Sequence, residues 1–191
     1  MKFHYGGKYN SEEDLKSKAE PQEGAVAFKE PSEKVFAIIA NGGSIVVLIL
    51  LAGLVYFIAR PERTDCIISF GIACVLSMVV IIPHEFLHAI CFREDVYMYF
   101  NPSKFLAFVH GTESMSKARF VFMSFLPNIV FGFIPFIVFL FNPEWFRLGM
   151  FGAVCISMGF GDYINAFNAA TQMPTGARTY LDGFHSYWYM P

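Results

Sequence analysis

The sequence has few charged residues and no excess of positive charge. Only 16% of its 191 residues are charged, against roughly 25% in ordinary soluble domains. The 14 Lys and Arg residues are outnumbered by 16 Asp and Glu residues. A nucleic-acid-binding protein usually needs a basic surplus to neutralise phosphates, so we expect no nucleic-acid partner. Hydrophobic residues make up 55% of the chain, which indicates a protein solvated largely by lipid.

Several signatures of other protein classes are also missing. Residues 1–34 are polar and mixed in charge, so we expect no secretory signal peptide. The four cysteines lie at irregular spacing in or beside apolar runs, a pattern that fits neither a disulfide framework nor a zinc finger. The chain has no Gly-x-Ser-x-Gly elbow and no phosphate-binding glycine loop. These absences argue against an α/β-hydrolase and against a P-loop nucleotide-binding protein.

Four apolar runs are long enough to cross a bilayer, which takes about 20 apolar residues in a helix. They predict membrane-spanning helices at about residues 35–59, 66–92, 120–143 and 148–170. Short connections make consecutive spans antiparallel neighbours. We therefore predict an all-α integral membrane protein, a four-transmembrane-helix bundle over residues 35–177, with the lipid bilayer as its surroundings.

The positive charges predict how this bundle is oriented. Four spans place residues 1–34, the connection 93–119 and residues 178–191 on one side of the membrane. All but three of the 14 Lys and Arg residues lie on that side, the exceptions being Arg60, Arg63 and Arg147. Because short cytoplasmic segments are enriched in Lys and Arg, we expect a multi-pass plasma-membrane protein with both termini in the cytoplasm.

The segments outside the membrane are predicted to be small. Residues 1–34 form a polar cytoplasmic tail, for which we expect disorder or a short surface helix, and residues 178–191 form a second cytoplasmic tail. Aromatic and apolar residues at 96–100 and 105–110 flank Asn101-Pro102-Ser103-Lys104. This pattern predicts a small cytoplasmic β-hairpin between helices 2 and 3, with His110 on its surface.

The residues His84-Glu85-Phe86-Leu87-His88 form an H-E-x-x-H motif near the end of the second span. Residues four apart share one face of a helix, so both imidazoles can bind one zinc ion with Glu85 beside it as general base. At membrane depth such polar groups are costly unless they are paired, coordinated or hydrated. Pro83 is a supporting residue that either kinks the helix before the ligands or simply punctuates the span.

A catalytic zinc site usually has three protein ligands, so a third must come from elsewhere in the chain. Asp162 lies 15 residues beyond Arg147 and His84 lies 18 residues beyond Cys66. At 1.5 Å per residue these separations are about 22 Å and about 27 Å from the same membrane face, which places both side chains at similar depth. Asp162 is therefore our predicted third ligand.

The residues around Asp162 and a second acid, Asp182, both bear on the choice of the third ligand. Gly159 and Gly161 allow a neighbouring helix to approach Asp162 closely, and Asn165 lies one turn further along as a supporting residue. Asp182, in Leu181-Asp182-Gly183, is the alternative third ligand, although Asp-Gly is also a common turn sequence.

The chain resembles a known family in motifs spread over most of its length. The matching stretches are His84-Glu85-Phe86-Leu87-His88-Ala89, Glu113 with Met115-Ser116-Lys117-Ala118-Arg119-Phe120, Leu126-Pro127-Asn128, Gly132-Phe133-Ile134-Pro135, Gly161-Asp162 with Asn165, and Pro174-Thr175-Gly176-Ala177. The family is named "Putative zincin peptidase" and comprises small four-span bacterial membrane proteins related in layout to the site-2 proteases. The resemblance implies zinc-dependent peptide hydrolysis in or at the membrane, with His84 and His88 as ligands and Glu85 as base.

Site-2 proteases carry their third ligand in the pattern Asn-x-x-Pro-x-x-x-x-Asp-Gly. Here Asn168 precedes Pro174 by six residues and Asp182 follows it by eight. This departure weakens the case for Asp182 and keeps both third-ligand assignments open.

We therefore predict a zinc metallopeptidase that cleaves a transmembrane or membrane-associated protein by water-activated hydrolysis. The alternative is a non-catalytic membrane protein in which a metal or polar cluster stabilises the bundle. A metal-ion transporter ranks last, because only one intramembrane acid besides Glu85 is available for a permeation path.

Overall fold

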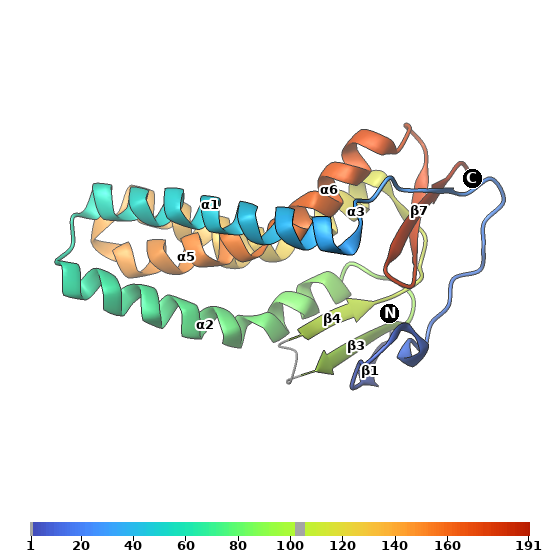
Figure 1. Cartoon of the computed structure of the whole chain (residues 1–191), viewed down its shortest axis with the longest axis horizontal. Coiled ribbons are helices and arrows are strands. Elements are labelled where there is room, and N and C mark those ends of the chain that lie inside the picture. Colours follow the sequence, from blue (N-terminus) through green and yellow to red (C-terminus); the bar gives the residue numbers. More distant parts are fainter. Residues whose placement is uncertain (1, 102–105) are drawn as a thin grey trace. The chain divides into compact units, whose positions relative to one another are not determined.

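The computed structural model describes residues 2–101 and 106–191 (Figure 1). The helical segments are α1 Glu33–Ala59, α2 Arg63–Ala89, α3 Lys117–Asn128, the π-helical segment η3 Ile129–Phe133, α4 Ile134–Phe141, α5 Phe146–Met158, α6 Phe160–Gln172 and the short 3-10 turns η1 Glu12–Asp14 and η4 Pro143–Trp145. The strands are β1 Phe3–Gly7, β2 Val26–Ala27, β3 Val96–Asn101, β4 Leu106–His110, β5 Met115–Ser116, β6 Arg178–Asp182 and β7 His185–Tyr189.

The chain divides into two compact units. The helical unit comprises residues 31–84 and 125–164, and the sheet unit comprises residues 1–30, 85–124 and 165–191. The division falls inside α2, α3 and α6, so each of these helices contributes residues to both units.

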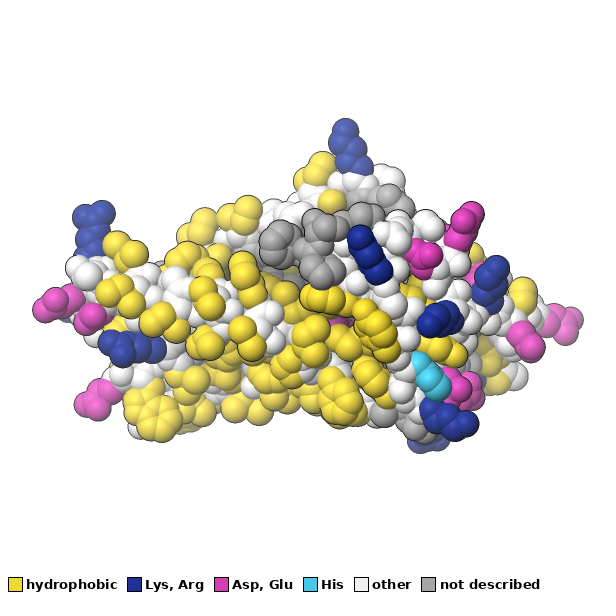
Figure 2. Space-filling model, turned by 90° about the horizontal axis from the view of Figure 1, so that it is seen from below, with side chains coloured by type: hydrophobic (Ala, Val, Ile, Leu, Met, Phe, Trp, Pro, Cys, Tyr) yellow, Lys and Arg dark blue, Asp and Glu magenta, His cyan; other side chains and the backbone are white. Residues whose placement is uncertain are grey.

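Among the described residues, three helical stretches are long and apolar enough to cross a membrane, namely Lys34–Ala59, Arg63–Ala89 and Lys117–Phe141. They coincide with the first three predicted spans. Their outward side chains are largely apolar, as in Ile49, Leu50 and Val79. Figure 2 shows hydrophobic side chains covering a broad part of one face, with most charged side chains outside this area. A surface of this kind is suited to lipid rather than water.

The fourth predicted span is two helices rather than one. α5 and α6 have 13 residues each, which is short of the about 20 residues that a single helical crossing needs. The break lies at Gly159, where the backbone leaves helical geometry at φ −74° and ψ 9°. Gly159, which we interpreted as a close-packing residue, therefore also marks a helix boundary, whereas Gly161 lies inside α6. The four-span count stays a prediction.

The helical unit is held together by close helix contacts. α5 packs against α1, and α4 and η3 also lie against α5 (Figure 1). A Cβ placed on Gly152 of α5 would lie 2.7 Å from the backbone nitrogen of Phe136 and 2.8 Å from the carbonyl oxygen of Gly132. Both distances are too short for a non-bonded carbon contact, so this crossing requires glycine.

Replacing Gly152 with Ala is expected to lower the free energy of unfolding by about 1–3 kcal/mol, because the added methyl group collides with backbone. Reversible unfolding in detergent micelles measures this change. Gly53→Ala in α1 is the matched control, since a Cβ there meets nothing within 4 Å and Ala is the better helix former. Equal destabilisation by both substitutions would contradict the close approach at Gly152.

The chain is mostly helical, as predicted, but the sheet unit shows that it is not purely all-α. It contains a three-stranded sheet in the order β1-β3-β4 and a four-stranded sheet in the order β2-β7-β6-β5. β1 and β2 come from residues 1–34, for which we had expected disorder or a short surface helix. β6 and β7 form a hairpin from the segment predicted as a C-terminal tail. These short strands are stabilised by partners distant in sequence, as in the pairs Phe3↔Val96 and Val26↔Trp188.

The predicted hairpin between the second and third spans is confirmed. β3 and β4 pair antiparallel, with Tyr97 opposite His110 and Asn101 opposite Leu106. Of the predicted turn sequence, residues 102–104 lie outside the described residues. Because the three-stranded sheet ends at β4, one side of this strand is a sheet edge.

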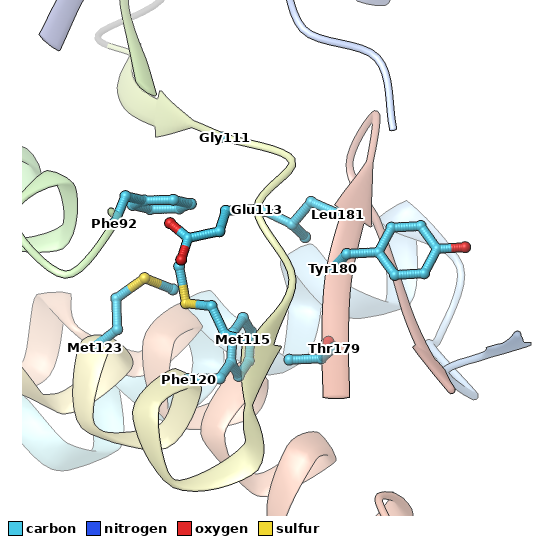
Figure 3. Close-up of a pocket in the computed structure, with 9 residues that line it drawn as sticks. All are labelled: Phe92, Gly111, Glu113, Met115, Phe120, Met123, Thr179, Tyr180 and Leu181. Carbon is cyan, nitrogen blue, oxygen red and sulfur yellow. The ribbon is translucent and has the colours of Figure 1, made fainter. Parts of the chain in front are cut away.

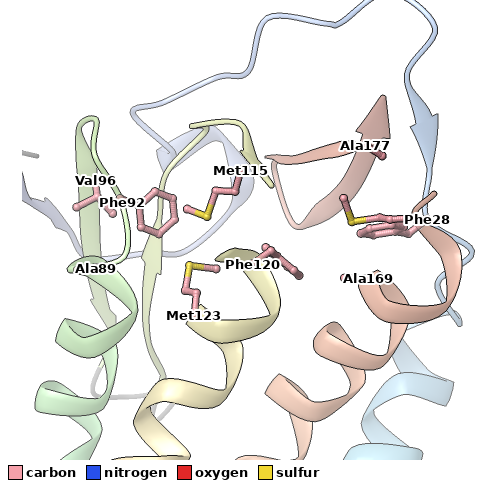
Figure 4. Packing of buried hydrophobic residues seen from close by; sticks show 10 residues of the cluster. Phe28, Ala89, Phe92, Val96, Met115, Phe120, Met123, Ala169 and Ala177 are labelled. Atoms are coloured by element: carbon pink, nitrogen blue, oxygen red, sulfur yellow. The ribbon is translucent and has the colours of Figure 1, made fainter. Parts of the chain in front are cut away.

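The sheet unit has its own hydrophobic core, which includes residues from the end of α2, the start of α3 and α6 (Figure 4). It contains Phe28, Ala89, Phe92, Val96, Met115, Phe120, Met123, Ala169, Met173 and Ala177. Because Ala89 is the last residue of α2 and is fully buried, this core holds the end of the helix that carries the H-E-x-x-H motif.

An ion pair between a partly buried arginine and a buried glutamate fixes the residues that follow α2. Arg119 in the first turn of α3 pairs with Glu113 and donates from Nε to the carbonyl oxygen of Cys91 at 2.7 Å. Glu113 also accepts the backbone N–H groups of Arg93 and Glu94. Its carboxylate lies beside Phe92 in a small cavity (Figure 3). Burial alone would raise the pKa of Glu113, but the hydrogen bonds from Arg119 and the two backbone groups hold it below its usual value.

Candidate metal site

The end of α2 carries a compact group of polar side chains. One ligand atom from each of His84, Glu85 and His88 lies within 4.8 Å of the other two, and all three residues are partly buried. These side chains lie close together because α2 continues through Pro83 to Ala89 and residues four apart share a helix face. Pro83 therefore does not end the helix. Within the described residues, no second group of His, Cys, Asp and Glu has this spacing.

His88 is held in one orientation by a backbone carbonyl. Its Nδ1 lies 3.0 Å from the carbonyl oxygen of Met123 in α3. A carbonyl only accepts hydrogen bonds, so Nδ1 is the donor in this contact, and Nε2 is the nitrogen that would bind a metal ion. This partner could not be predicted from the sequence, since a backbone carbonyl has no residue-type signature.

Glu85 lies against the free edge of the hairpin sheet. Its Oε2 accepts a hydrogen bond from the backbone N–H of Val109 in β4 at 3.0 Å. Because this N–H donates to a side chain outside the sheet, it points away from β3. The carboxylate is therefore fixed beside an edge strand and remains partly exposed.

In the helical unit, Asp162 lies next to His84. Its Oδ2 is 3.3 Å from Nε2 of His84, and the two side chains are 21% and 24% exposed. The same oxygen accepts a hydrogen bond of 3.0 Å from Nδ2 of Asn128. Asp162 is in the first turn of α6, three residues after the break at Gly159. Asp162 and His84 were predicted to lie at similar depth in the membrane, but no role was predicted for Asn128.

A family model described as "Putative zincin peptidase" matches residues 77–178. The chain belongs to this family. The matched stretch contains the H-E-x-x-H motif, Asn128 and Asp162, and it ends before Asp182. Comparisons with curated proteins and with solved structures gave no match.

The residues at the end of α2 fit the zinc ion that the zincin family implies. Imidazole nitrogens and carboxylate oxygens are the usual ligands of catalytic zinc. In the ring of His88, Nδ1 donates to a carbonyl, as the second nitrogen of a metal-binding histidine commonly does. Partial exposure of the group is consistent with access for water.

Two of the other predicted site residues lie in different surroundings. Asp182 is exposed at the turn of the β6–β7 hairpin, directly before Gly183 with a positive φ of 60°. This is the environment of a turn residue. Asn165, one turn beyond Asp162 on α6, is also exposed.

His110 differs from its prediction as a surface residue. Its side chain is only 2% exposed, and its two ring nitrogens contact the hydroxyl of Ser17 at 2.9 Å and the carbonyl oxygen of Gly183 at 3.0 Å. Burial lowers the pKa of His110. This histidine therefore joins the N-terminal segment, the hairpin and the β6–β7 turn of the sheet unit.

Proposed function

We propose that this protein is a zinc-dependent membrane peptidase, with His84, His88 and Asp162 as metal ligands and Glu85 as general base. The observation that carries the proposal is the group formed by His84, Glu85 and His88, whose ligand atoms lie within 4.8 Å of one another. It occurs within the stretch that matches a family described as zincin peptidases.

Asp162 is supported as the third ligand by its distance from His84. Two ligands of one tetrahedral zinc ion, each about 2.0–2.1 Å from the metal, are about 3.3 Å apart. The separation of Asp162 Oδ2 and His84 Nε2 is 3.3 Å. Asp182 stays the alternative, but its exposed turn position gives it no comparable support.

The catalytic roles follow from the chemistry of these side chains. When bound, zinc would acidify a water molecule and polarise a peptide carbonyl. Glu85 would accept the proton of the attacking water and pass it to the departing amine, as a general base and then a general acid. A helical substrate must unwind locally first, because its carbonyl groups are otherwise engaged in the helix.

The proposed setting is the plasma membrane, with a transmembrane or membrane-associated protein as substrate and both termini in the cytoplasm. The pairing of β1 with β3 and of β2 with β7 supports a common side for the N-terminal segment, the hairpin connection and the C-terminal segment. The positive-inside distribution supports the cytoplasmic assignment of that side.

Metal removal tests the proposed function. Zinc-loaded protein in detergent should generate new peptide N-termini in a solubilised membrane-protein extract, and mass spectrometry identifies them. Chelation with 1,10-phenanthroline should stop their formation, and an equivalent of zinc should restore it. His88→Ala protein is the control for contaminating proteases. An unchanged set of N-termini after chelation, or none from the loaded protein, would favour the alternative of a structural metal or polar cluster.

A further inference from the structure

We infer that Asn128 is a positioning residue that holds Asp162 against His84, and that glycine at position 159 is required to make room for it. Asn128 is the last residue of α3 and is only 1% exposed. Its Nδ2 donates to the same Asp162 oxygen that lies 3.3 Å from His84. The metal readout of this inference rests on the proposed function.

The orientation of the Asn128 amide is set by Asp162. An ionised carboxylate only accepts hydrogen bonds, so the NH₂ group of the amide must face it. Among the described residues, Oδ1 of Asn128 then has no hydrogen-bond partner, although it is buried. A buried acceptor without a partner is unfavourable for stability. An apolar side chain of similar size would avoid this cost, so the amide is explained better by its effect on Asp162 than by packing.

The neighbouring backbone has the shape that this amide needs. A Cβ placed on Gly159 would lie 1.9 Å from Oδ1 and 2.2 Å from Nδ2 of Asn128. No other residue type fits there while the amide keeps its position. The amide therefore packs directly on the backbone at the break between α5 and α6, three residues before Asp162.

The helix that carries Asn128 is also irregular at this point. The π-helical segment Ile129–Phe133 begins immediately after Asn128, and the N–H of Ile134 bonds to the carbonyl of Ile129. Pro135 has no N–H to donate and would disturb a regular α-helix here. Single π-helical turns occur frequently at functional sites. Two interruptions of regular helix thus flank the contact between Asn128 and Asp162, one in each helix.

A hydrogen bond from an amide N–H has two effects on a metal-binding carboxylate. It fixes the plane of the carboxylate and favours the ionised form that binds a cation. Removing such a supporting partner typically lowers metal affinity about 10- to 100-fold. Asn128 would thereby act on the metal only through Asp162.

The test compares zinc dissociation constants of purified full-length variants, measured by competition with a chromophoric chelator. Asn128→Leu keeps the branched shape of the side chain without the donor and should raise the zinc Kd about 10- to 100-fold. The unfolding midpoint of its zinc-free form should equal or exceed that of wild type, whereas a purely structural role would lower it. Ser157→Ala is the control, because this buried hydroxyl donates within its own helix, to the carbonyl oxygen of Val154.

A double-mutant cycle of Gly159→Ala and Asn128→Ala tests whether the glycine is needed to make room for the amide. Asn128→Ala also replaces Asn128→Leu if the leucine variant does not fold. Gly159→Ala should raise the zinc Kd in the wild-type background. It should add little in Asn128→Ala, where the amide that its methyl group would strike is gone. Additive effects would overturn the role of Gly159, and wild-type affinity in Asn128→Leu and Asn128→Ala would overturn that of Asn128. A wild-type protein that binds no zinc would overturn both this inference and the proposed function.

Discussion

Glu85→Gln is expected to lower the rate of peptide cleavage about 10²- to 10⁴-fold, the range that a positioned general base supplies. The substitution changes little else, because the amide oxygen of Gln can still accept the hydrogen bond that Val109 donates to Glu85. An uncharged amide cannot take a proton from water. The new peptide N-termini formed in a membrane-protein extract give the rate.

The same variant separates an enzyme from a structural protein. Zinc should stay bound in Glu85→Gln, since His84, His88 and Asp162 are unchanged. Glu94→Gln is the matched control, because Glu94 is an exposed acid just beyond α2 and its side chain has no place in the proposed mechanism. Cleavage by Glu85→Gln at the wild-type rate would rule out Glu85 as the base, and an unaltered cellular phenotype would favour the structural alternative.

Asp162→Ala is expected to weaken zinc binding about 100-fold or more. Structural zinc sites with four protein ligands bind with roughly 10–16 kcal/mol, so one ligand is worth about 3 kcal/mol. Asp182→Ala is the matched comparison, because Asp182 is an exposed turn residue and its loss should leave the affinity unchanged. Zinc titration of both variants gives the answer. The opposite result, in which only Asp182→Ala loses zinc, would move the third ligand to the β6–β7 turn.

The helices and the metal motif could be predicted because their signals are local. Apolar runs and the charges that end them predicted the first three spans, which coincide with helical stretches long and apolar enough to cross a membrane, Lys34–Ala59, Arg63–Ala89 and Lys117–Phe141. The H-E-x-x-H motif needs only one continuous helix to bring its side chains together. The hairpin was also predictable, because both strands and its turn lie within 15 residues, 96–110.

The strands of the terminal segments could not be predicted in the same way. β2 has only two residues, and its partner β7 lies about 160 residues later in the chain. Nothing in the sequence of either strand specifies the other. A polar N-terminal segment was therefore interpreted as a tail, although its backbone completes two sheets.

The surroundings of Asp162 were only partly visible in the sequence. Asn128 lies in one of the stretches that carry the family resemblance. Its polar amide within an apolar run could have indicated a functional role. Its contact with Gly159 depends on the break between α5 and α6. This break could not be predicted, because the apolar run continues through it. The partner of His88, the carbonyl of Met123, follows from the packing of α3 and not from any residue type.

The zinc content of detergent-purified wild-type protein and of His84→Ala, determined by mass spectrometry, tests whether α2 carries a metal site. His84 belongs to the motif group and also contacts Asp162, so the whole proposed site depends on it. We predict about one zinc ion per wild-type chain and none in His84→Ala. A folded wild-type protein that binds no metal when zinc is supplied, or a His84→Ala variant that keeps it, would contradict the account.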